Sequence, residues 1–180
     1  MIAAQQKRKE NIVEYILYIY QIEDMIRAFQ FNISNIEIQL VSQYQVDEKT
    51  RVEILDWYKN LVIMMEKEGI REKGHLQFLS NQINELNEFH LKLMETEIDK
   101  GYVGIFQSIS GLITELNQKN KSVKKDLQIS LDAIYGFLLL KMQQKEITEE
   151  TTEAIKRLSG WLSLLSKLYK DFESEDLAFE

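Results

Sequence analysis

The chain has 180 residues, the length of one domain, which is enough to bury a hydrophobic core. It contains neither proline nor cysteine, so the strongest helix breaker is missing and disulfide bonds, thiolate catalysis and cysteine-based metal centres are excluded. Its 22 basic and 29 acidic side chains give a net charge of −7, the wrong sign for a nucleic-acid-binding protein. These features predict an all-α single domain over residues 1–180, a bundle of about six to seven helices, mostly antiparallel.

The amino terminus does not resemble a signal peptide. Basic residues precede an apolar stretch there, but Glu14 interrupts it and no small-residue cleavage site follows. The longest apolar runs in the chain fall far short of the roughly 20 residues that a membrane-spanning helix needs. We therefore expect a cytoplasmic protein with no membrane and no nucleic acid as partner.

The first helix is predicted from about Ala4 to Gln30. Its stripe of isoleucines continues at helical spacing onto Glu23 and Arg27, whereas Asp24 falls on the face that we expect to meet water. An acid four residues before a base on one face favours an ion pair, so this pair is interpreted first as a structural brace. The alternative is that Arg27 binds a ligand carboxylate or phosphate while Glu23 holds it in place.

Residues that commonly begin or end helices define the bounds of the next two helices. A kink at the FNIS segment starts a short helix to about Tyr44, with Asn32 or Ser34 as its N-cap. Asp47 is predicted to cap the third helix, which ends at Gly69 in the left-handed conformation.

The fourth helix is predicted from about Gly74 to Asp99, and His90 interrupts its apolar stripe. A single core histidine most often forms a hydrogen bond with a neighbour, which is our first interpretation; a metal-binding, catalytic or pH-sensing role is the alternative.

The segment EKGH, from Glu72 to His75, has the Glu-x-x-His spacing of di-iron carboxylate bundles. Such a site needs the motif twice, and Asn87 stands where the second glutamate would precede His90. We therefore predict no metal site and no cofactor.

The fifth helix is predicted from about Tyr102 to Asn117, and the sixth from about Ser122 to Lys145. Three small residues share one face of the fifth helix, which favours close helix packing over a ligand floor: Gly104, Ser108 and Gly111. Four lysines lie between the two helices and are interpreted as a solvated connector: Lys119, Lys121, Lys124 and Lys125.

Thr148 is predicted to cap the seventh helix, and the acidic tail from about 173 to 180 is expected to fray. The segments Glu149–Glu153 (EETTE) and Glu173–Asp176 (ESED) resemble the signature of all-α nucleoside triphosphate pyrophosphohydrolases, whose acids bind magnesium from facing helices. An unbroken apolar stripe instead predicts one straight helix, with its acidic ends about 30 to 36 Å apart. Acids at that separation do not share an ion.

Three segments carry a wider resemblance: KENIVEYILYIYQIEDMIRA, WYKNLVIMMEKEGI and KGHLQFL. They are similar to an uncharacterised all-helical family of Bacteroidetes proteins, domain of unknown function 4924. The resemblance implies a single helical domain over nearly the whole chain. It implies no activity and no site.

These patterns favour a non-enzymatic cytosolic bundle that acts by binding another protein or itself, because no set of catalytic residues stands out and several helices have wide apolar faces. The alternative is a small-molecule-binding or hydrolytic bundle with a pocket around Glu23, Arg27 and His90. A magnesium-dependent pyrophosphohydrolase is the third possibility.

Overall fold

The computed structural model describes residues 2–119 and 124–179. This part of the chain contains no strand and folds into eight α-helices and one 3-10 turn, which confirms the all-α class. The elements are α1 (Ile2–Glu10), α2 (Ile12–Ala28), α3 (Ile33–Gln39), η1 (Val41–Gln43), α4 (Glu48–Lys67), α5 (Gln77–Thr96), α6 (Lys100–Gln118), α7 (Asp126–Met142) and α8 (Glu149–Glu173).

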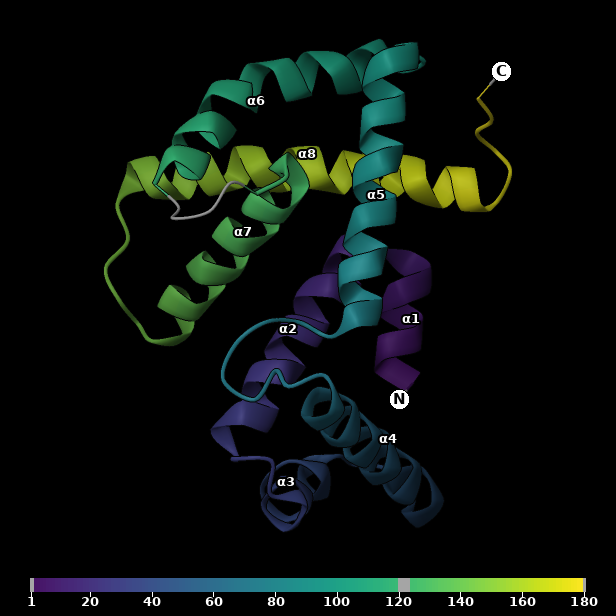
Figure 1. Ribbon diagram of the computed structural model, residues 1–180, viewed down its shortest axis with the longest axis vertical. Coiled ribbons are helices and arrows are strands. Elements are labelled where there is room, and N and C mark those ends of the chain that lie inside the picture. Colours follow the sequence, from purple (N-terminus) through teal and green to yellow (C-terminus); the bar gives the residue numbers. More distant parts are fainter. Residues whose placement is uncertain (1, 120–123, 180) are drawn as a thin grey trace.

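The helix count exceeds the predicted six to seven because the predicted first helix is divided at Asn11. Asn11 has an extended backbone (φ −155°, ψ 107°), and its side chain accepts a hydrogen bond from the amide of Glu14 at 3.0 Å. It therefore caps α2, and the chain turns so that α1 and α2 pack against each other (Figure 1).

Local signals placed most other boundaries correctly. The side chains of Asn32, Asp47 and Thr148 accept hydrogen bonds from backbone amides and cap α3, α4 and α8, as predicted. Gly69 follows α4 with φ +69°, which confirms the left-handed position. Gly74 also has a positive φ, +97°, so it belongs to the turn before α5 rather than to the helix.

Two predicted features between α6 and α7 lie outside the described residues. They are the helix start at Ser122 and the connector lysine at position 121. The described part of α7 runs from Asp126 to Met142 and ends before Lys145.

The buried apolar side chains form two clusters. The larger core is built from the first half of α2 with α5, α6, α7 and α8, and the smaller core from the second half of α2 with α3 and α4. Figure 1 shows α3 and α4 together at the lower end of α2, and α5 to α8 toward its other end. Helix α2 thus joins two packed groups of helices.

The helices of the larger group do not all run antiparallel. In Figure 1 α5 crosses α8 steeply, and α7 runs obliquely to it. None of the helices in the described part of the chain is long and apolar enough to cross a membrane.

The carboxyl-terminal tail turns at the end of α8. The amides of Glu175 and Asp176 bond to the carbonyls of Phe172 and Asp171, which is the hydrogen-bond pattern of a Schellman motif. Phe179 then reaches the ring of Phe89, with centroids 5.7 Å apart. The fraying of the acidic tail stays a prediction.

Candidate functional site

Glu23 is fully buried and binds the start of α5. One carboxylate oxygen accepts a hydrogen bond from the amide of Leu76 at 2.8 Å, and the other lies 2.6 Å from Nδ1 of His75. Leu76 is the N-cap residue of α5, whose own side chain cannot cap a helix. The buried carboxylate therefore does so from another helix, where its negative charge suits the helix dipole.

His75 is held on two sides. Its ring stacks on the ring of Tyr20, with centroids 3.7 Å apart and planes 13° from parallel, while Glu23 binds one nitrogen. Tyr20 in turn accepts a hydrogen bond from the side-chain amide of Gln128 on α7 at 2.9 Å. This chain of contacts fixes the turn before α5 against α2 and α7.

Arg27 does not pair with Glu23, so the predicted ion pair is wrong. Its guanidinium donates to the backbone carbonyls of Ile70 and Gly74, and to Asp24 at 2.9 Å. Asp24 was expected to face water, but it also accepts a hydrogen bond from Tyr135 on α7 at 2.7 Å. Both candidate residues on α2 thus brace the turn at residues 70–76, each with its own partners.

His90 lies in the larger core, away from this turn. It is 2% exposed, and its Nδ1 is 2.6 Å from the hydroxyl of Tyr102 on α6. The rings of Phe106 and Trp161 enclose it, and burial lowers its pKa from 6.5 to about 4. The predicted hydrogen bond to a neighbour is confirmed.

The three candidate residues do not meet. His90 stands fourteen positions after Leu76, the residue that Glu23 binds, which corresponds to about 21 Å along the helix. The contacts of Glu23 and Arg27 are with the turn before α5 and with Asp24 of α2, whereas those of His90 are with α6 and α8. A single pocket around all three is not formed.

The two metal-binding patterns have ordinary explanations. The eighth helix runs unbroken for 25 residues, so Glu149 and Glu173 stand about 36 Å apart at its two ends. His75 of the EKGH segment binds Glu23. No group of three histidine or acidic side chains in the described residues is placed to hold a metal ion.

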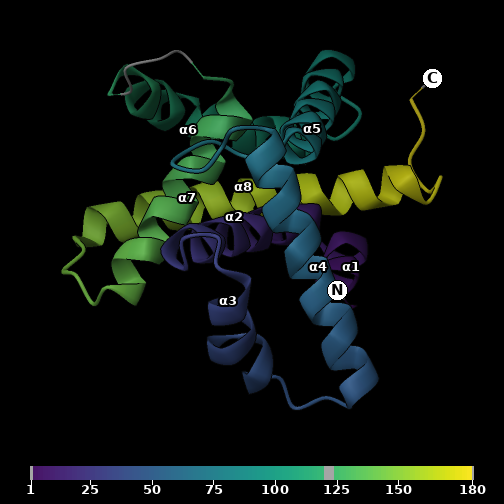
Figure 2. The same ribbon diagram turned by 60° about the horizontal axis from the view of Figure 1, so that its bottom comes forward.

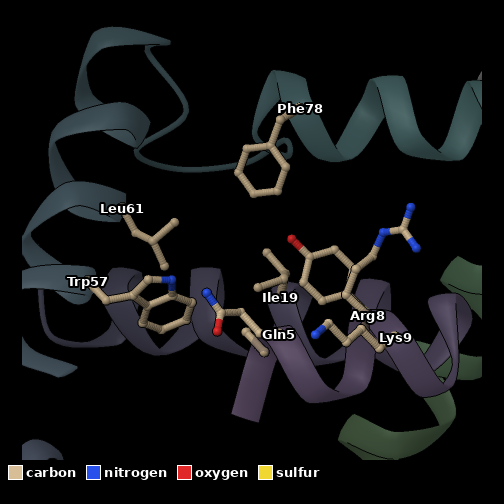
Figure 3. Close-up of a pocket in the computed structure, with 9 residues that line it drawn as sticks. Gln5, Arg8, Lys9, Ile19, Trp57, Leu61 and Phe78 are labelled. Atoms are coloured by element: carbon tan, nitrogen blue, oxygen red, sulfur yellow. The ribbon is translucent and has the colours of Figure 1, made fainter. Parts of the chain in front are cut away.

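A cavity of about 500 Å³ lies between α1, α2, α4 and the start of α5 (Figure 3). Its volume falls in the range of small-molecule pockets. None of Glu23, Arg27 and His90 lines it. The lining residues are Ala4, Gln5, Arg8, Lys9, Tyr15, Ile19, Trp57, Leu61 and Phe78. Sequence reasoning missed this cavity because its walls come from segments far apart in the chain and no local motif marks it.

The end of α7 exposes large apolar side chains. Ile134 and Phe137 point into the larger core, but Leu138, Leu140 and Met142 are 40%, 37% and 65% exposed. Both views place this end of α7 at the edge of the molecule (Figures 1 and 2). In the sequence, this exposed end lies within the apolar run AIYGFLLL, residues 133–140, and Met142 follows it.

Comparison with known proteins gives a family and nothing beyond it. The family model described as "Domain of unknown function (DUF4924)" matches residues 1–176, so the chain belongs to this family. No curated protein and no solved structure matches the chain.

Proposed function

We propose that this DUF4924 protein is a non-enzymatic binding protein and that the exposed end of α7 docks onto a second copy of the chain. The observation that carries this proposal is the exposure of Leu138 and Met142, which are four residues apart and therefore share one face of the projecting end of α7. We call these two side chains the α7 patch.

The composition of α7 supports a covered patch. Apolar residues occur on all sides of this helix, a pattern typical of helices that are surrounded by other protein. Here the fold covers the first part of the helix, whereas most of its last turn, from Leu138 to Met142, is exposed. Association of two copies around a twofold axis would remove both patches from water, and an apolar patch is complementary to itself without any matching of charges.

The placement of the charged residues supports a non-enzymatic role. Glu23 caps a helix, Arg27 binds backbone carbonyls, and His90 is enclosed by aromatic rings. Each of these groups is used inside the fold, where it has a structural task.

The proposed setting is the bacterial cytoplasm. The absence of cysteine is in keeping with a reducing compartment, and the resemblance to Bacteroidetes sequences is the basis for a bacterial source.

Sedimentation equilibrium over a wide range of protein concentration tests the proposal. We expect a monomer–dimer equilibrium for the wild type and a monomer for Leu138→Glu combined with Met142→Glu, because two copies would then bury like charges. Ile63→Glu, on an exposed apolar position of α4, is the matched control and should leave the dimer intact. A wild type that stays monomeric throughout, or a double variant that still dimerises, overturns the proposal.

A further inference from the structure

We infer that the cavity between α1, α2, α4 and α5 binds a small amphipathic molecule that carries a single negative charge. This site is separate from the α7 patch, and none of its lining residues belongs to that patch.

The apolar part of the ligand would lie against α4 and the start of α5. Ile19 and Leu61 are buried next to the cavity, while the rings of Trp57 and Phe78 are only partly covered. Figure 3 shows Trp57 and Leu61 at one end of the cavity and Phe78 across from Ile19. Flat, partly covered rings favour a ligand with an aromatic or acyl body.

The charge at the other end selects an anion. Arg8 and Lys9, both on α1, lie at the end opposite Trp57 (Figure 3), and none of the described residues that line the cavity carries a carboxylate, although the whole chain has a charge of −7. This local excess of positive charge contrasts with the acidic surface elsewhere.

One of the two cations is already neutralised. Arg8 binds Glu173 of α8 through two hydrogen bonds of 2.7 and 2.9 Å, and this pairing raises the pKa of the guanidinium. Lys9 has no ion-pair partner within the described residues. The net charge of the lining is therefore close to one, which matches a ligand with a single anionic head such as a carboxylate or sulfonate.

A pair of fluorescent probes tests the inference. 8-Anilinonaphthalene-1-sulfonate has a ring system and one sulfonate; N-phenyl-1-naphthylamine has the same rings without the charge. We expect the sulfonate probe to bind saturably at one site per chain and more tightly than the neutral probe. Lys9→Gln should lower the affinity for the sulfonate probe about three- to fivefold and leave the affinity for the neutral probe unchanged.

Two control variants show whether the effect of Lys9→Gln is specific to the charged probe. Trp57→Ala should weaken the binding of both probes, because it removes the apolar wall. Lys49→Gln, which changes an exposed lysine on α4 away from the cavity, should weaken the binding of neither. The α7 double variant should bind both probes normally, which separates this inference from the proposed dimer. Unsaturable binding, or an equal effect of Lys9→Gln on the two probes, overturns it.

Discussion

Arg27 is held in place mainly by backbone oxygens. Its side chain is 14% exposed and donates to two carbonyls of the turn before α5 as well as to Asp24. The spacing of Glu23 and Arg27 predicted a charged brace within one helix. The carbonyl partners could not be predicted, because backbone groups of a distant turn leave no trace in a local pattern.

Arg27→Met should destabilise the protein by about 1–3 kcal/mol, because the carbonyls of Ile70 and Gly74 lose their donor. Urea unfolding measures this change. Lys67→Met, at an exposed position of α4, serves as the control and should stay within about 0.5 kcal/mol of the wild type. An unchanged or higher free energy of unfolding in Arg27→Met would mean that these hydrogen bonds contribute nothing to stability.

His90 should make stability depend on pH. Burial lowers its pKa from 6.5 to about 4 in the folded state, so between these values the unfolded chain binds a proton that the folded chain does not. Stability should therefore fall as the pH falls through this window, by up to about 1.4 kcal/mol per unit. Urea midpoints at several pH values, compared with those of His90→Gln, measure the effect, and an unchanged slope in the variant would contradict it.

At the scale of elements, Asn11 does more than cap α2. Its side-chain oxygen accepts hydrogen bonds from the amide of Glu14 and from the hydroxyl of Ser166 on α8, and that hydroxyl accepts from the amide of Ile12. The turn between α1 and α2 is thus tied to α8 by a small closed network.

Asn11→Ala should lower the free energy of unfolding by about 1–2 kcal/mol. This loss should exceed that of Asn32→Ala, which removes the side chain that caps the short α3. Both variants remove an N-cap asparagine, so the difference between them isolates the contact with Ser166. Thermal unfolding gives the comparison, and equal losses would show that this contact adds nothing to the cap.

The helix ends show which parts of the fold are locally encoded. Asp47 and Thr148 were predicted as caps because each cap depends on residues only three positions away. Asn11 was missed because it lies within a run of good helix formers, where an asparagine costs only tenths of a kcal/mol. The cavity and the buried contacts of Glu23 depend on residues more than fifty positions apart, which helix periodicity does not report.

At the scale of the whole molecule, Glu23 lies where the two cores meet. It is on α2, which belongs to both, and it binds Leu76, which belongs to the smaller core. The larger core supplies neighbours for Trp161, while Trp57 on α4 packs at the border of the two cores. The carboxylate therefore helps to couple two groups of helices.

Glu23→Gln should weaken this coupling, because it removes the negative charge at the start of α5 and replaces one of the two acceptor oxygens with an NH2 group. In a Trp161→Phe background Trp57 is the one remaining tryptophan. We expect its fluorescence transition in urea to coincide with the far-UV circular dichroism transition when Glu23 is present, and to precede it in Glu23→Gln. Glu37→Gln, an exposed acid of α3, should keep the transitions together. Coincident transitions in Glu23→Gln would contradict the coupling.

Amide hydrogen exchange at low and high protein concentration tests whether the α7 patch docks onto a second copy of the chain. We expect the peptide covering residues 133–142 to exchange more slowly at high concentration, and the peptide covering residues 48–67 of α4 to stay unchanged. Equal exchange of α7 at both concentrations, or protection that appears only on another helix, would contradict it.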